Sequence, residues 1–223
     1  MNRSIDEEKS GGSVLLTSED GKFVFVFTQF GIWRIDTRGV LSSVQKLDTH
    51  FNWAVNEGLV TGELMVVGSV TSGMLVFQVD VTGGLTMVAH FNRFDRTEIH
   101  PVSLAMNKQE GLIYLLDQAE NIYVYKVLKG RVSSYDIISF KHSGNLKIRA
   151  EGPHLLYSFV ENNNFKICEL IYNYQTKQAE LVRYYKLFDY ITDFFVHGRE
   201  MLVFSSDLLD WFPIGVDPRL IKR

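Results

Sequence analysis

The segment closest to a known catalytic pattern is Ser43-Val-Gln-Lys46, which has the Ser-x-x-Lys spacing of a nucleophile and its base. That spacing brings the two side chains together on a helix. In a strand, residues three apart point to opposite faces, and the surrounding sequence favours a strand. We therefore interpret Ser43 and Lys46 as solvent-facing residues of an outer strand.

Histidines and cysteine are the next candidates for catalysis or metal binding. No two histidines have His-x-x-x-His spacing and none lies beside a Cys-x-x-Cys pair, so a helical zinc motif is absent. We interpret each histidine as a hydrogen-bonded residue at the corner of a strand. The single cysteine, Cys168, lies in an alternating apolar run and is predicted to be a buried small hydrophobic residue. The six histidines are His50, His90, His100, His142, His154 and His197.

Glycine pairs, which can bring the backbone close to a phosphate, occur at Gly11-Gly12 and Gly83-Gly84. Neither pair leads into an expected helix, and the sequence has no phosphate-loop motif. The acidic run Asp6-Glu7-Glu8 reads as solvated charge in a terminal tail. These patterns predict that the chain is not an enzyme and has no catalytic residues, no metal, no cofactor and no small-molecule substrate.

Two basic segments are the candidate sites for a protein partner. They contain Arg93, Arg96, Lys126, Lys129 and Arg131. The first two lie beside two phenylalanines in a connection that we expect to be a long loop, and the other three surround an expected hairpin. Basic side chains, arginine beside aromatic rings above all, suit acidic proteins or phosphates. The alternative is that both segments are solvated and only aid solubility.

The charge balance of the 223-residue chain is nearly even, with 23 Lys plus Arg against 26 Asp plus Glu. A net charge of −3 offers no strong field for nucleic acid or anionic lipid. A single cysteine favours a reducing compartment, and no apolar run approaches the ~18 residues of a membrane helix. We expect a protein of the nucleus or cytoplasm, not secreted, with a disordered tail at 1–12 and one domain at 13–223.

Short apolar runs separated by turn residues occupy the chain from Val14 onward, which predicts a nearly all-β fold. Five of these runs recur regularly, and each is followed by a hairpin and another strand. Their first residues are 23, 64, 112, 155 and 201, at separations of 41, 48, 43 and 46. A repeat of about 45 residues built from short strands is typical of the blades of a WD-repeat propeller.

The repeat favours a WD40-like β-propeller of about five blades over a β-sandwich, which has no reason to repeat at this interval. A four-stranded blade has two apolar faces, and radial stacking covers both of them. The fifth unit is short, so an incomplete or open propeller stays an alternative to a closed one.

Within the WD-repeat superfamily, the chain resembles the noncatalytic WD-repeat subunit of the tRNA (guanine-N7)-methyltransferase. The resemblance covers three stretches. They are VLLTSEDGKFVFVF at 14–27, the range from LMVVGSVTSGMLVFQVD through HPVSLAMNKQEGLIYLLDQAENIYVYKV at roughly 64–127, and LLYSFVENNNFKICELIYNYQTKQAELVRYYKLFDYITDF at 155–194. That family has seven blades, so about two central blades are missing between Val127 and Leu155. The family's catalytic subunit binds S-adenosylmethionine and the tRNA.

The resemblance implies a scaffold that stabilises a methyltransferase subunit and meets tRNA only through it. The alternative is a general WD-repeat scaffold in another multiprotein complex, such as trafficking, the nuclear pore or ribosome assembly. A propeller hydrolase or lectin is a third class. It would require Asp, Glu or His at the inner ends of successive blades, a pattern that we do not find in the sequence.

Overall fold

The computed structural model describes residues 13–39, 43–48, 54–118, 121–140, 142, 144–186, 191–198, 200–205 and 209–213. These residues form strands and turns, which confirms the all-β prediction. None of them belongs to a helix long and apolar enough to cross a membrane. The predicted tail at 1–12, with its acidic run and its glycine pair, and His50 lie outside the described residues.

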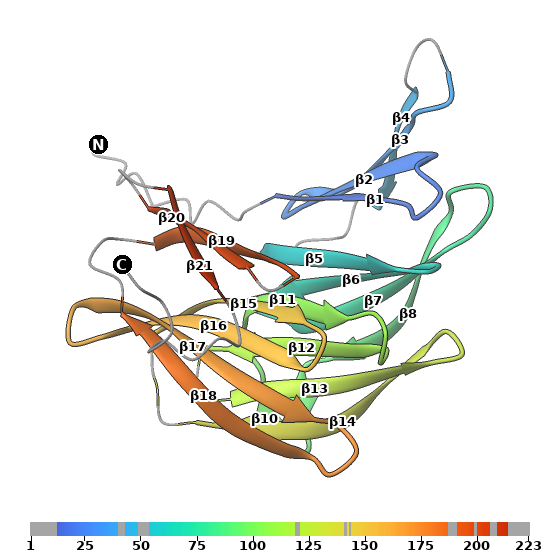
Figure 1. Ribbon diagram of the computed structural model, residues 1–223. Helices are drawn as coiled ribbons and strands as arrows, with labels where there is room; N and C mark the ends of the chain where they lie inside the picture. The colour runs from blue at the N-terminus through green and yellow to red at the C-terminus, as the bar shows by residue number, and fades with distance from the viewer. Residues whose placement is uncertain are drawn as a thin grey trace, which may run out of the picture. The chain divides into compact units, whose positions relative to one another are not determined.

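The described residues form 21 strands, most of them joined by short turns (Figure 1). In chain order they are β1 (Val14–Thr17), β2 (Phe23–Thr28), β3 (Gly31–Asp36), β4 (Ser43–Asp48), β5 (Val55–Thr61), β6 (Leu64–Ser69), β7 (Gly73–Val79), β8 (Leu85–Phe91), β9 (Arg93–Phe94), β10 (Thr97–Glu98), β11 (Pro101–Asn107), β12 (Leu112–Asp117), β13 (Asn121–Leu128), β14 (Arg131–Ser139), β15 (Asn145–Glu151), β16 (His154–Glu161), β17 (Asn164–Asn173), β18 (Gln178–Lys186), β19 (Ile191–His197), β20 (Glu200–Ser205) and β21 (Leu209–Pro213).

The strands pair in chain order into separate antiparallel sheets. Four sheets have four strands each, β1-β2-β3-β4, β5-β6-β7-β8, β11-β12-β13-β14 and β15-β16-β17-β18. A fifth has three strands, β19-β20-β21, and β9 pairs with β10 in a small hairpin. The five runs that set the sequence interval are β2, β6, β12, β16 and β20, the second strand of each sheet. This arrangement is that of a β-propeller with about five blades, as predicted.

The chain divides into two compact units, residues 1–92 and 93–223. The first unit contains the sheets β1–β4 and β5–β8, and the second contains the hairpin β9–β10 and the three later sheets. Each unit is described by itself. The single domain expected over 13–223 stays a prediction.

The repeat appears again in the hydrogen bonds between sheets of the second unit. The amide of Ile148 donates to Ser103 Oγ at 3.1 Å, and Asn107 Nδ2 donates to the carbonyl of Gly152 at 2.7 Å. Arg149 Nε donates to the carbonyl of Phe194 at 3.1 Å. Each bond joins residues 45 positions apart, so equivalent parts of successive sheets lie against each other.

Irregular register also recurs at equivalent places. In four sheets the pairing of the first and second strands slips near the start of the first strand, between Val55 and Glu57 in one of them. In all four four-stranded sheets the pairing of the third and fourth strands slips as well, between Val76 and Phe77 for example. A bulge increases local twist, so the same bulges give each sheet a similar twist.

The core of the first unit forms where its two sheets bury alternate strand positions. In β2 the alternation is regular, and Phe23, Phe25 and Phe27 are 2%, 0% and 0% exposed. They belong to one cluster with Met65 and Leu75 of the neighbouring sheet. All six residues of β6 are buried, because this strand has apolar neighbours on both of its faces. Each aromatic ring buried in this way stabilises the fold by about 1.5–3 kcal/mol.

The second unit is built in the same way from β11–β18. All six residues of β12 are buried, and Tyr114, Tyr157 and Cys168 belong to one cluster that joins the two four-stranded sheets. A second cluster joins Tyr185 and Phe194, which lie on successive sheets. Burial on both faces makes β12, like β6 in the first unit, depend on packing from either side.

The β16–β17 turn shows why asparagine occupies these hairpins. Glu161 pairs with Asn164, which leaves Asn162 and Asn163 as the two turn residues, with φ angles of 52° and 59°. Two-residue turns with positive φ at both positions match the right-handed twist of the strands, and asparagine tolerates that conformation better than most residues.

We predict that Asn163→Val lowers the free energy of unfolding by about 1–2 kcal/mol, because a branched side chain is strained at positive φ. Asn163→Gly keeps stability within about 0.5 kcal/mol of the native chain, because glycine adopts this conformation freely. Urea unfolding followed by circular dichroism measures both variants. Equal midpoints for the two would contradict this assignment of the turn.

Candidate functional site

The first predicted partner-binding segment forms the hairpin β9–β10, not the long loop expected from the sequence. The physical reason is Phe94, which is 6% exposed and stacks on Tyr123 with ring centres 5.2 Å apart. Burial of this ring fixes the segment against β13, so Phe94 is not available to a partner. Arg93 and Arg96 are exposed, and Arg93 Nη2 donates to Glu98 at 3.3 Å.

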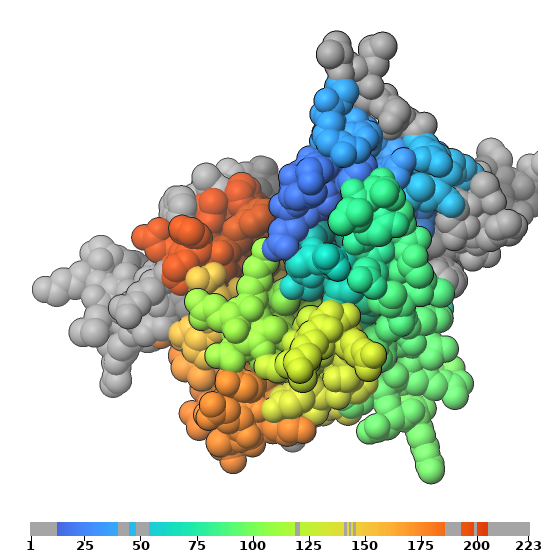
Figure 2. Space-filling model, turned by 90° about the vertical axis from the view of Figure 1, so that its right-hand side faces the viewer, coloured from blue at the N-terminus to red at the C-terminus, as the bar shows by residue number. Residues whose placement is uncertain are grey.

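The second predicted segment separates into engaged and exposed cations. The ammonium of Lys126 donates to the carbonyl of Glu110 and lies 4.9 Å from the centre of the Tyr174 ring. Lys129 and Arg131 are exposed at the β13–β14 turn, which projects as the yellow lobe in Figure 2. The structure thus leaves two of these three side chains accessible, and their role in binding stays a prediction.

The Ser-x-x-Lys segment lies in β4, as expected. This strand pairs with β3, and Lys46 Nζ lies 5.1 Å from the centre of the Trp33 ring. Cys168 is fully buried, also as expected, and burial raises the pKa of its thiol to about 11. A buried thiol that stays protonated near neutral pH is a poor nucleophile.

A buried polar network in the sheet β15–β18 was not anticipated from the sequence. The Glu169 carboxylate is fully buried, and it lies 2.8 Å from His154 Nδ1 and 3.3 Å from Arg183 Nε. The hydroxyl of Tyr185 donates to it at 2.6 Å. Burial and this hydrogen bond raise the pKa of Tyr185. The buried charge is compensated within one sheet, which is a structural role. His154 is hydrogen-bonded, as predicted for each of the histidines.

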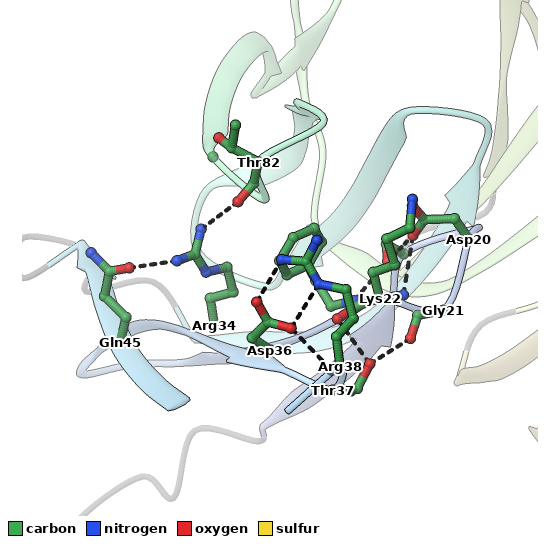
Figure 3. Close-up of polar contacts among 12 residues, drawn as sticks. Asp20, Gly21, Lys22, Arg34, Asp36, Thr37, Arg38, Gln45 and Thr82 are labelled. Atoms are coloured by element: carbon green, nitrogen blue, oxygen red, sulfur yellow. Dashed lines mark hydrogen bonds and ion pairs between the residues drawn. The ribbon is translucent and has the colours of Figure 1, made fainter. Parts of the chain in front are cut away.

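In the first unit, Arg34 ties the β7–β8 turn to the first sheet, and Arg38 lies nearby within that sheet (Figure 3). Arg34 Nη1 donates to the carbonyl of Thr82 at 2.8 Å. The Arg38 guanidinium makes two hydrogen bonds to Asp36, of 2.9 and 2.6 Å, and the Arg38 amide adds a third; together they lower the pKa of that carboxyl to about 2. Both guanidinium groups lie over the ring of Phe23, at 5.4 and 4.8 Å.

A cleft of about 340 Å³ opens beside this network, between the first two sheets. We call it the first cleft. Apolar side chains of Phe23, Val60, Met65 and Val79 line it, together with Val81, which is 87% exposed. Its other lining residues lie on the β1–β2 and β5–β6 turns and at the end of β7, and include four carboxylates. These are Glu19, Asp20, Glu63 and Asp80.

The four carboxylates differ in their surroundings. Asp20 pairs with Lys22 at 2.8 Å, and Asp80 accepts hydrogen bonds from the turn that follows it, which lowers the pKa of both carboxyls. Glu63 accepts one long hydrogen bond of 3.3 Å from a glutamine, and Glu19 has no hydrogen bond or ion pair within the described part of the chain. Within the described part of the chain, no group of three or more acidic, histidine or cysteine side chains is placed to hold a metal ion.

The second unit has a cleft at the equivalent place, between the sheets β11–β14 and β15–β18. We call it the second cleft; its volume is about 370 Å³. Its lining comes from the β11–β12, β15–β16 and β17–β18 turns, which are the counterparts of the three turns around the first cleft. The side chains are mainly amides and tyrosines, with one carboxylate, Glu110. The same position in the repeat therefore carries different chemistry in the two units.

Neither cleft was anticipated from the sequence. Acidic residues were expected only at the inner ends of blades, as a mark of an active site, whereas Glu19, Asp20, Glu63 and Asp80 lie in or beside turns. The signal in the sequence is an acidic residue at each of three strand ends in the first two repeats, in the segments SEDG, GELM and VDVTGG.

Neither a protein-family model nor a curated protein sequence matches the chain. Solved structures do. A protein from Lactobacillus plantarum has a TM-score of 0.70 at 15% identity, over 89% of this chain and 69% of that one. The β-propeller domain of Nup133 from Vanderwaltozyma polyspora has a TM-score of 0.67 at 12% identity, over 96% of this chain and 72% of that one. At these identities the similarity shows the fold alone.

One similar structure corrects an expectation from the sequence. The periplasmic gluconolactonase PpgL of Pseudomonas aeruginosa has a TM-score of 0.63 at 12% identity, over 76% of this chain and 52% of that one. The prediction that this chain is not an enzyme is therefore wrong, because an enzyme has a similar fold and the fold does not exclude catalysis. The physical reason is that the motif search tested only local spacing, whereas a site on a propeller is assembled from several distant turns.

We predict that Gly83→Ala lowers the free energy of unfolding by about 1–3 kcal/mol more than Gly21→Ala. Both glycines have positive φ, 78° and 72°, so both variants incur the strain of that conformation. A Cβ at Gly83 would come within 2.7 Å of the Phe23 ring, while one at Gly21 would meet nothing within 4 Å. Urea unfolding of both variants measures the difference. Equal losses would show that the β7–β8 turn does not pack on Phe23.

Proposed function

We propose that this chain is a protein-binding β-propeller that serves as a scaffold subunit of a multiprotein complex. The observation that carries the proposal is the pair of clefts at equivalent positions in the two units, with different side chains in each. Clefts formed by turns on a rigid scaffold are suited to recognition, because turn residues vary without changing the sheets that hold them. A scaffold role is compatible with catalysis, and binding is the part that we propose.

The similar structures support the scaffold role over a more specific one. They include the propeller domain of a nucleoporin, and the nuclear pore is one of the complexes named for the general scaffold alternative. The resemblance to the tRNA methyltransferase subunit rests on strand patterns at 14–27, 64–127 and 155–194, and the structures named above support its fold only. A methyltransferase partner, with tRNA bound through it, stays the narrower hypothesis, as does a nuclear or cytoplasmic location.

The exposed basic turns are the surfaces proposed to meet an acidic region of the partner. Arg93 and Arg96 on one hairpin and Lys129 and Arg131 on another belong to the same unit. Guanidinium groups pair with two carboxylate oxygens at once, so they favour acidic partners over neutral ones. Lys126 is left out of this set because its ammonium is engaged within the protein.

We predict that Arg93→Glu with Arg96→Glu weakens the complex with the partner at least tenfold, because it replaces attraction by repulsion. The partner is identified by affinity capture of the tagged chain with cross-linking and mass spectrometry, then purified, and its affinity is measured by titration calorimetry. Exposed charge changes alter stability by only about 0.5 kcal/mol, so a loss of binding is not a folding defect.

A matched control keeps the overall charge change constant. Lys46→Glu with Lys108→Glu changes two other exposed cations, and its affinity should stay within twofold of the native chain. Equal loss in both double variants would assign the effect to net charge and remove the hairpin from the interface. Failure of any purified protein to form a stoichiometric complex would overturn the scaffold proposal. A captured methyltransferase subunit would support the narrower hypothesis.

A further inference from the structure

The first cleft has an apolar interior and an acidic rim, and this combination selects one kind of occupant. We infer that it binds a lysine or arginine side chain presented by an extended segment of the protein partner. The inference rests on the proposed function, because it names how one surface of the scaffold recognises that partner.

The interior fits the aliphatic part of a long basic side chain. Phe23 and Met65 are 2% and 0% exposed, and Val60 and Val79 are partly buried beside them. Val81, at 87% exposed, supplies further apolar surface. Lysine and arginine bury their methylene stems along apolar surface while the charged end remains among polar groups. A volume of about 340 Å³ lies at the lower end of small-ligand sites, so it suits one side chain.

The rim supplies the complementary charge. Of the four carboxylates, Asp20 is paired with Lys22, while Glu19 and Glu63 have no cationic partner in the described residues. The arginines closest to the cleft are engaged with other groups, Arg34 with Thr82 and Arg38 with Asp36. Two carboxylates are therefore available to a cation, and a phosphate or an acidic peptide would be repelled.

The two glutamates approach the cleft from different sheets. Glu19 lies on the β1–β2 turn and Glu63 on the β5–β6 turn. The Glu19 carboxylate reaches the β5–β6 turn, because a Cβ placed at Gly62, the residue before Glu63, would lie 3.9 Å from Glu19 Oε2. A cation between them would contact both sheets. Figure 2 shows the adjoining β7–β8 turn, in green, beside the first sheet, in blue.

The second cleft serves as an internal comparison. It has a similar volume, about 370 Å³, and the same three kinds of turn, but amides and tyrosines replace most of the carboxylates. It has a single carboxylate residue, Glu110, and the Lys126 ammonium lies beside that residue, where it donates to the backbone carbonyl. Charge selection is therefore expected at the first cleft and not at the second.

The test uses a fluorescein-labelled peptide, Gly-Ser-Leu-Lys-Leu-Ser-Gly, and its counterpart with norleucine in place of lysine. Norleucine keeps the aliphatic stem and removes the charge. Anisotropy titrations of the full chain in 50 mM and 500 mM NaCl measure both affinities. We expect the lysine peptide to bind at least tenfold more tightly at low salt, with the difference falling at high salt because charges are screened.

Variants assign the effect to the cleft. Glu19→Gln with Glu63→Gln should weaken binding of the lysine peptide at least fivefold. Glu180→Gln with Glu200→Gln removes the same charge from two exposed residues elsewhere and should leave binding within twofold. The ¹³C-labelled methyl group of Met65 should shift on titration, since it lines the cleft. Equal binding of the norleucine peptide, an unaffected Glu19 and Glu63 variant, or an unmoved Met65 signal would each overturn the inference.

The outcomes separate this inference from the scaffold proposal. A stable complex with a purified partner and no preference for the lysine peptide would remove the cleft assignment and leave the scaffold role standing. Selective binding of the lysine peptide without any protein complex would remove the scaffold role and leave the cleft as a site for a basic side chain.

Discussion

Two strands of this protein, β6 and β12, are apolar on both of their faces, and much of the rest of the structure follows from that property. Every residue of β6 and β12 is buried, so each of these strands needs packing on both of its faces. Sheets stacked for this reason meet along seams, and the seams end where the strands give way to turns. The clefts lie at those ends. They follow from the way two-faced sheets pack, and the turn residues decide what chemistry each cleft holds.

The strands were predictable because their signal is local. Alternating apolar residues and turn residues recur at a fixed interval, and the hydrogen bonds between residues 45 apart are the three-dimensional form of that interval. The hairpin at Arg93 was not predictable, since it depends on a pocket for Phe94 formed by β13. The first cleft could not be predicted for a similar reason. Glu19, Glu63 and Asp80 come from three turns that are separated in sequence and meet only after the sheets have stacked.

The absence of catalytic motifs proved to be a weak basis for excluding catalysis. A motif on one strand or helix is visible in sequence because its residues are close in the chain. A propeller assembles its surfaces from many turns, so neither a binding site nor an active site needs to leave a short pattern. The similarity to a gluconolactonase makes the point for this fold. Function is better approached here through the chemistry of particular clefts than through the fold itself.

The bulges at equivalent positions have a consequence for how this chain tolerates changes in length. Strand side chains alternate, so deletion of a bulge residue such as Asn56 or Val102 would turn the adjoining part of the strand inside out. Insertions within strands would have the same effect. The separation between successive runs varies from 41 to 48 residues, and turns and connections are the places where such variation leaves the strand alternation intact. Changes in length are best tolerated in turns, including those that form the rims of the clefts, where a new residue alters recognition and leaves the sheets intact.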